Sequence, residues 1–234
     1  MLPKVIIHNS ISLDGSLTNF EVNMGLHYQI AGNFKPDAHL IGSNTMITGI
    51  ELYGEGTAPE TERDFVKPQR DASLPYWIII DTKGILKGEL HAIRRFEFSR
   101  DVVVLISEIT PKEYITYLNE RNYDHHILGN EQVDLIRALA FISEKYEANT
   151  ILTDTGQILG NLLFNLGVVN EISLLIHPVI VGSGSYNMFK SIGNGISLNM
   201  ERSEVLDDGY VWLLYKIENK LNSSISPSFQ LKNK

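Results

Sequence analysis

Short apolar segments alternate with longer amphipathic ones along most of this chain, and that alternation limits the fold more than any other feature. The apolar segments are rich in β-branched residues and predict strands at residues 4–9, 38–41, 77–80, 102–106, 123–128, 150–153 and 171–176. The intervening segments predict helices at residues 24–34, 43–53, 111–122, 133–146 and 159–166. Strands that alternate with helices indicate an α/β sheet with parallel neighbours.

The last part of the chain changes pattern. Residues 197–206 and 211–218 read as two strands, and the Asp207-Asp208-Gly209 turn between them is a hairpin signal. An antiparallel hairpin therefore closes the predicted sheet. Beyond residue 218 the chain is rich in Asn, Ser and Lys, which cannot build a core. We expect one domain over residues 1–218 and a polar tail over residues 219–234.

Composition matters chiefly through the absence of cysteine from all 234 residues. This absence excludes disulfides, iron–sulfur clusters, thiol nucleophiles and zinc sites that use cysteine, including the zinc deaminase signature. The formal charge of −8 argues against nonspecific nucleic-acid binding, which depends on neutralising phosphates.

The apolar runs are short. Those at residues 77–80 and 102–106 fall far below the roughly 20 residues that span a bilayer. The first four residues lead directly into a predicted strand, without a signal-peptide pattern. We expect a cytoplasmic protein without a membrane partner.

Residues 54–75 break the alternation. This segment contains Gly54, Gly56, Pro59, Pro68 and Pro75 among charged residues, with little periodicity. A connection of this length is usually either functional or disordered. A surface loop and a lid over a ligand site both remain open.

Several kinds of catalytic site find no support. There is no Gly-x-Ser-x-Gly nucleophile motif, no Walker A motif and no Gly-x-Gly-x-x-Gly. The Gly182-Ser183-Gly184 fragment lacks the helix that a dinucleotide-binding turn would open. The histidines form no His-x-x-x-His pair, so we expect structural roles and no metal site for His8, His27, His39, His91, His125, His126 and His177.

What remains is a set of small and polar residues at predicted strand ends. In open α/β sheets, ligands bind beyond the carboxyl ends of the strands, and helix starts offer free N–H groups to anions. Four such places stand out: Leu13-Asp14-Gly15, Gly42-Ser43-Asn44-Thr45, Thr153-Asp154-Thr155-Gly156 and Gly182-Ser183-Gly184.

In order and spacing, these pieces resemble the pyrimidine reductase family of riboflavin biosynthesis. The family's Ser-Leu-Asp-Gly start is matched by residues 12–15, and its Gly-x-x-Thr turn by residues 42–45. Later in the chain, the family has a helix, an Asp-Glu pair that leads into a strand, and then Pro-Val and Gly-x-Gly. Residues 166–184 match this series. The resemblance covers roughly residues 4–218. It implies a dihydrofolate reductase-like three-layer α/β domain with a central, mostly parallel mixed sheet and a C-terminal antiparallel hairpin.

The resemblance also implies an NADPH-dependent reductase that transfers hydride to a sugar C1 or a related C=N or C=O group. Its substrate would be a small molecule such as a phosphorylated ribosylaminopyrimidine, with Asp14 and Glu171 on the substrate side as catalytic residues. The cofactor would be bound by Gly42, Ser43, Asn44, Thr45, Ser107, Gly129, Asp154, Thr155, Gly156 and Gln157.

Three positions depart from the family's pattern. Ser16 replaces a basic residue after Asp-Gly, Gln157 replaces the second glycine of a Gly-Gly turn, and Asn170 replaces an aspartate. These departures leave two alternatives open. One is a binding protein on the same fold with no catalysis or an altered ligand, in which Gln157 fills or narrows the cleft. The other is a dihydrofolate reductase-like enzyme that reduces a pterin.

The resemblance implies a homodimer as well. The predicted strand at residues 172–176 and the hairpin residue Trp212 are candidate interface material. Core packing is the alternative for Trp212.

Overall fold

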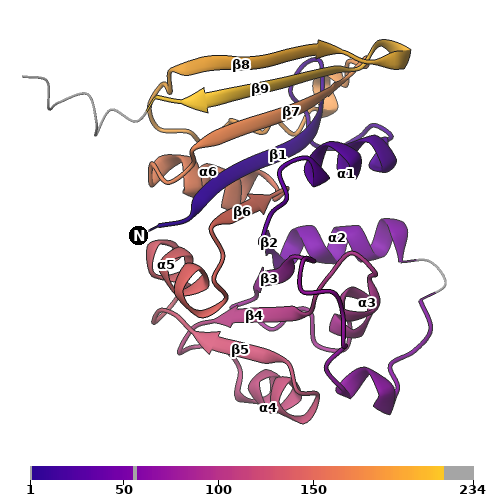
Figure 1. Ribbon diagram of the computed structural model, residues 1–234, viewed down its shortest axis with the longest axis vertical. Coiled ribbons are helices and arrows are strands. Elements are labelled where there is room, and N and C mark those ends of the chain that lie inside the picture. Colours follow the sequence, from indigo (N-terminus) through magenta and orange to yellow (C-terminus); the bar gives the residue numbers. More distant parts are fainter. Residues whose placement is uncertain (1, 55–56, 219–234) are drawn as a thin grey trace, which may run out of the picture.

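A nine-stranded sheet runs through the described part of the chain, residues 2–54 and 57–218 of the computed structural model (Figure 1). Its strand order is β5-β4-β3-β2-β6-β1-β7-β9-β8. All neighbours pair in parallel except β9, which is antiparallel to both β7 and β8. The strands are β1 (Lys4–Ser12), β2 (Ala38–Gly42), β3 (Tyr76–Ile80), β4 (Val102–Ile106), β5 (Asp124–Ile127), β6 (Thr150–Thr153), β7 (Glu171–His177), β8 (Leu198–Val205) and β9 (Val211–Ile217).

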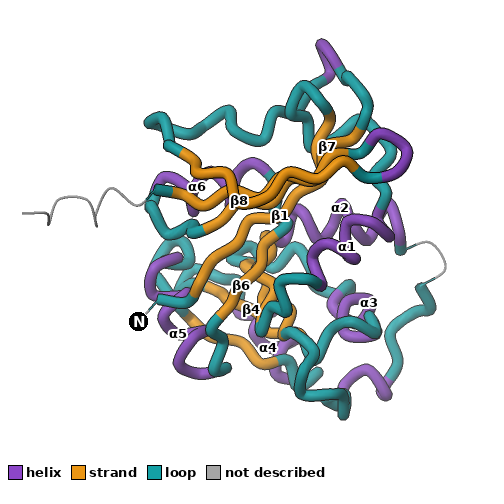
Figure 2. Tube along the Cα trace, turned by 45° about the horizontal axis from the view of Figure 1, so that its top comes forward, coloured by secondary structure: helices purple, strands orange, loops and turns teal. Residues whose placement is uncertain are grey.

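Six α-helices accompany these strands in the described residues, and Figure 2 shows them on both sides of the twisted sheet. They are α1 (Met24–Gly32), α2 (Ser43–Tyr53), α3 (Leu90–Arg95), α4 (Lys112–Glu120), α5 (Leu135–Lys145) and α6 (Gln157–Asn165). The predicted mixed α/β fold with a C-terminal hairpin is confirmed. The predicted tail, residues 219–234, lies outside the described residues.

Each face of the sheet has its own core because side chains alternate along a strand. On β3, Ile78 packs with α5 and α6, whereas Trp77 and Ile79 pack with α3 and α4. A smaller cluster joins Ile30 of α1 to Trp212 of β9. Helices thus form the outer layers on both faces, with the sheet between them.

Strand β1 is longer than its apolar pattern suggests. It was expected over residues 4–9 but continues to Ser12, which pairs with His177 of β7. The extension carries the buried polar residues Ser10 and Ser12, which make it look like part of a turn in the sequence. This extension brings polar groups into the middle of the molecule.

Helix α3 was not predicted. Its six residues are too few to show a full amphipathic period, although Leu90 and Ile93 are buried. Among the described residues, no helix is long and apolar enough to cross a membrane.

The described part of the connection between α2 and β3 is bound to the rest of the protein by an ion pair and hydrogen bonds. Its short 3-10 helix η1 (Glu62–Phe65) contains Asp64, which pairs with Arg95 of α3 at 2.7 Å. Arg70 donates to the carbonyl oxygens of Phe96, Ser99 and Arg94. The described part of this segment is therefore a fastened surface loop, and Thr57, Ser73 and Leu74 line a cleft.

Candidate active site

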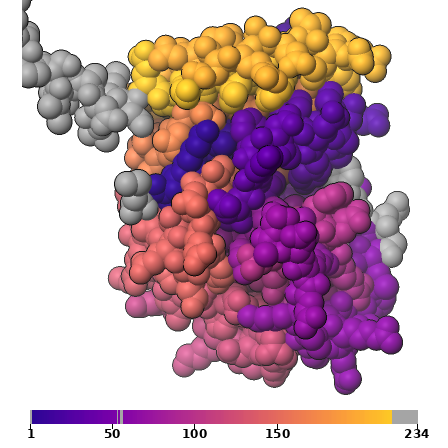
Figure 3. All heavy atoms as spheres, in the orientation of Figure 1, coloured from indigo at the N-terminus to yellow at the C-terminus, as the bar shows by residue number. Residues whose placement is uncertain are grey.

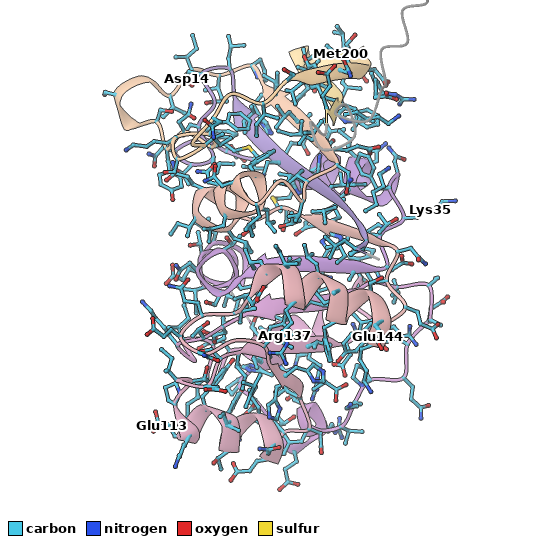
Figure 4. The ribbon with its side chains drawn as sticks, turned by 90° about the vertical axis from the view of Figure 1, so that its left-hand side faces the viewer. Asp14, Lys35, Glu113, Arg137, Glu144 and Met200 are labelled. Carbon is cyan, nitrogen blue, oxygen red and sulfur yellow. The ribbon has the colours of Figure 1, made fainter. Side chains whose placement is uncertain are left out.

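A large open cleft lies at the carboxyl ends of the central strands and continues between α1 and α2. Its volume is about 2890 Å³, and its lining reaches from Ser10 and Gly42 to Lys35. Figure 4 shows that Asp14, which follows β1, and Lys35, which precedes β2, lie on opposite sides of the molecule. The cleft lining runs from the strand ends at Ser10 and Gly42 along α1 to Lys35, which is long enough for an extended ligand.

Two of the predicted cofactor segments meet at this cleft. The backbone N–H of Gly156 donates to Thr45 Oγ1 at 3.1 Å, which joins the start of α6 to the start of α2. Both helices begin at a glycine, Gly42 or Gly156, and neither has a side-chain cap. The free N–H groups of two helix starts can thus bind an anion such as a pyrophosphate. All predicted residues of these turns line the cleft: Gly42, Ser43, Asn44, Thr45, Asp154, Thr155, Gly156 and Gln157.

Gln157 does not fill the cleft. Its side-chain Nε2 donates to the carbonyl oxygen of Asn187 at 2.5 Å, which holds the amide against that neighbouring loop. Gly156 and Gln157, at the start of α6, both line the cleft.

Polar side chains from three elements meet at the floor of the cleft. Ser10 Oγ of β1 lies 3.0 Å from His27 Nδ1 of α1, and His27 Nε2 lies 3.7 Å from Asp154 Oδ2 after β6. All three residues line the cleft. The other carboxylate oxygen of Asp154, Oδ1, is buried and has no hydrogen-bond partner in the structure.

Burial controls the charges around this floor. It lowers the pKa of His8 to about 3, with the nearby His27 adding to the effect, and it also lowers the pKa values of His39 and His177. Burial opposes ionisation of Asp154, but the interaction with His27 and the nearby His39 lower its pKa overall. At neutral pH we therefore expect an Asp154 carboxylate near the neutral imidazoles of His8, His39 and His177.

The two predicted catalytic residues lie outside the cleft lining. Asp14 accepts hydrogen bonds from Ser12 Oγ and from the N–H groups of Val181 and Gly182, which lower its pKa to about 2. Asp14 thus joins the turn after β1 to the loop at Val181 and Gly182. Glu171 begins β7, opposite Ile6 at the amino edge of the sheet, and pairs with Lys4 at 2.7 Å. We therefore leave both residues out of the proposed active site.

Ser107 and Gly129 also lie outside the cleft lining and shape a turn instead. The Ser107 hydroxyl donates to the carbonyl of Glu131, and Gly129 has a φ of 136° that favours glycine. Residues shortly after this turn, including Glu131 and Val133, line the cleft. Ser107 and Gly129 thus act on the cleft only through the turn.

The departure at Ser16 has a structural explanation. Ser16 is fully buried, donates to the carbonyl of Thr18 and accepts from the N–H of Tyr186. A charged side chain would not fit this role. Lys35 and Lys83 are cations that line the cleft instead.

Sequence reasoning missed Ser10 and His27 as site residues. Ser10 lies inside a strand extension that resembled a turn, and His27 is a single histidine on a helix. His27 and Asp154 are far apart in the chain, so no local motif could connect them. The nearest available signal was the row of polar residues His8, Asn9 and Ser10, which ends four residues before Asp14.

The sheet order, antiparallel end and carboxyl-edge cleft define the dihydrofolate reductase-like class of α/β domains. Within this class, the chain belongs to the RibD C-terminal domain family, whose model matches residues 3–212. This is a family of riboflavin-biosynthesis reductase domains. A comparison with curated proteins found no match.

Solved structures support the fold. A pyrimidine reductase-like protein from Corynebacterium diphtheriae is similar with a TM-score of 0.68 and 16% identity, covering 92% of each chain. Acinetobacter baumannii RibD gives a TM-score of 0.64 at 15% identity, covering 92% of this chain and 58% of that one. The riboflavin biosynthesis reductase Rib7 of Saccharomyces cerevisiae gives 0.62 at 17% identity, covering 92% and 90%.

Proposed function

We propose that the protein is an NADPH-dependent reductase that transfers hydride to the sugar C1 of a phosphorylated ribosylaminopyrimidine. The observation that carries this proposal is the contact between Thr45 and Gly156, which holds two uncapped helix starts at one cleft. Membership of the reductase family supports the reaction class.

The residues present fit a dinucleotide. The N–H groups at the starts of α2 and α6 would bind the pyrophosphate, and Lys83 lines the same cleft after β3. Apolar and aromatic side chains of Trp77 and Phe96 line it further along and can cover a planar ring. NADPH, when bound, supplies the hydride, while the chain orients the reactants and excludes water.

The test is a titration with NADPH followed by nicotinamide fluorescence, together with thermal unfolding. Binding selective for the folded state stabilises it by about 2.7 kcal/mol at a ligand concentration of 100 Kd. We expect saturable binding and oxidation of NADPH by a ribosylaminopyrimidine phosphate. Absence of binding up to millimolar NADPH would falsify the proposal.

The buried Ser16 favours a second candidate, a reductase of the same fold with another carbonyl, imine or pterin substrate. Many family members have a basic residue at this position, whereas the Ser16 hydroxyl here forms hydrogen bonds with the loop backbone. Turnover of dihydrofolate, without turnover of the ribosylaminopyrimidine phosphate, would select the pterin reductase. NADPH binding without turnover of either compound would favour a binding protein with an altered ligand.

A further inference from the structure

Ser10, His27 and Asp154 form a continuous polar series in the lining of the cleft, called here the proton chain. The first contact, Ser10 Oγ to His27 Nδ1, is 3.0 Å, and the second, His27 Nε2 to Asp154 Oδ2, is 3.7 Å. Ser10 and His27 are only 6% and 5% exposed, yet both line the cleft. Asp154 lines the cleft as well, with its side chain 12% exposed and its Oδ1 buried, so the series joins three neighbouring groups of the cleft lining.

A second series of hydrogen bonds holds His27 in position. His8 Nε2 faces the carbonyl oxygen of His27 at 3.1 Å, and because a carbonyl only accepts, this nitrogen carries the proton. Neutral His8 then accepts at Nδ1 from Ser173 Oγ, which itself accepts from Trp212 Nε1. The backbone at His27 is thereby fixed against β1, and the ring of His27 packs against that of His8 with 4.4 Å between the ring centroids.

The groups that face His27 come from four strands. They are His8 on β1, His39 on β2, Asp154 after β6 and His177 on β7. Burial lowers the pKa values of the three histidines, so they are neutral near pH 7. Asp154 is then the one charged group among these four, and its negative charge favours a proton on His27 Nε2.

Reduction of a C=N or C=O group consumes one proton for each hydride. The hydride brings two electrons to the carbon, the π electron pair moves to the nitrogen or oxygen, and that atom takes a proton. Any reductase of this class therefore needs a proton donor within reach of the cleft.

We propose that Ser10, His27 and Asp154 deliver this proton, an inference that rests on the proposed reductase function. Ser10 passes its hydroxyl proton to the substrate nitrogen or oxygen and takes the Nδ1 proton of protonated His27. His27 keeps its Nε2 proton toward Asp154 and becomes neutral. It is protonated again from solvent after the product leaves. Ser10 is the catalytic residue, and His27 and Asp154 are positioning residues.

The first test is spectroscopic and needs no cofactor. In protein labelled with 15N in its histidines, we expect a proton on His27 Nε2 and a hydrogen-bonded His27 Nδ1. Ser10→Ala should move the Nδ1 resonance of His27 and leave that of His125 on β5 unchanged. An unprotonated Nε2 on His27, or an unmoved Nδ1, would overturn the proton chain.

The second test is kinetic, with NADPH and a ribosylaminopyrimidine phosphate as the probe. Ser10→Ala should lower kcat by about 10²–10⁴-fold, the usual contribution of proton transfer, with little change in NADPH affinity. Ser10→Thr, which keeps the hydroxyl, should retain most of kcat. The rise of kcat toward acid pH should be lost in His27→Gln, whereas the matched control His125→Gln should keep it.

The outcomes separate the two proposals. Failure of the wild-type protein to bind NADPH overturns the proposed function, and the proton delivery falls with it. Normal NADPH binding with a wild-type kcat and pH profile in both Ser10→Ala and His27→Gln overturns the proton chain alone. Circular dichroism and thermal unfolding show whether each variant has folded.

Discussion

The polar residues inside β1 make different contacts on the two faces of the strand. His8 and Ser10 face α1 and contact His27, whereas Asn9 faces the other side and donates to the carbonyl of Thr155. Each is buried but has a partner, so none carries the full cost of an unpaired polar group. Single substitutions at these positions of β1 can therefore distinguish a change in folding stability from a change in ligand binding at the cleft.

Protonation of His8 should make stability depend on pH. Its pKa in the folded protein, about 3, lies below the ordinary 6.5, so between these values the unfolded chain binds more protons. Stability is then lost as pH falls from 6.5, by about 2 kcal/mol at pH 5 for this residue alone. Urea unfolding at pH 7 and pH 5 measures the difference.

His39 and His177 act in the same direction, because burial lowers their pKa values too. His8→Gln should therefore reduce the pH dependence without abolishing it. The control His125→Gln, on the half-buried strand β5, should leave it unchanged. Equal unfolding free energies at the two pH values in the wild-type protein would contradict this explanation.

Thr45 offers a second prediction at this scale. Thr45→Val removes the acceptor for the Gly156 N–H and leaves that donor to find another partner, at a cost of about 1–3 kcal/mol. We expect roughly tenfold weaker NADPH binding, because 1.4 kcal/mol corresponds to a factor of ten. Fluorescence titration measures it, with the exposed Thr116→Val on α4 as control. Unchanged affinity would show that the two helix starts keep their geometry without this bond.

At the scale of elements, the sequence predicted all nine strands of the described residues, since the buried parallel strands are short apolar runs with clear boundaries and the last two flank a hairpin turn. It failed where polar residues were buried in β1 and where α3 was too short to show a period. For the site, the Gly42–Thr45 and Asp154–Gln157 turns were recognisable, since both follow strands and start helices. Glu171 instead begins its strand, and this position alone places it at the amino edge of a parallel sheet.

The turn between β5 and α5 provides a test of backbone geometry. A Cβ on Gly129 would lie 2.0 Å from the carbonyl oxygen of Gln132, at a φ of 136°. Gly129→Ala should destabilise the protein by at least about 1–3 kcal/mol. Thermal or urea unfolding measures this cost.

The matched control is Gly49→Ala inside α2, where a Cβ would meet open space. This change should stabilise the protein by about 0.5–1 kcal/mol, since alanine favours a helix. Similar effects of the two substitutions would contradict the structural role assigned to Gly129.

For the whole molecule, the expected interface residues turn out to be internal. Trp212 is 5% exposed and Ile172 is 2% exposed, so both belong to the cores. The outer strand β8 is exposed along all eight residues and forms part of the yellow band at one end of the molecule (Figure 3). An exposed edge strand can pair with another chain.

We predict a homodimer that uses β8. Sedimentation should give twice the 26.4 kDa of one chain, and Met200→Lys with Val205→Lys should give the mass of one chain. Both side chains are exposed, so the fold should persist by circular dichroism. Ile127→Lys on β5, the opposite edge of the sheet, is the control that should remain dimeric. A wild-type protein that sediments as a single chain would contradict the prediction.

The position of β1 has a consequence for how the protein is made. This first strand lies between β6 and β7, pairing with residues 150–153 on one side and 171–177 on the other. During synthesis at about 5–20 residues per second, its partners emerge from the ribosome roughly 10–30 s after it does. Through that interval the buried side chains of β1 have no strand to pair with. Segment β1 is therefore exposed to misfolding and aggregation during synthesis for longer than its buried place in the finished sheet would suggest.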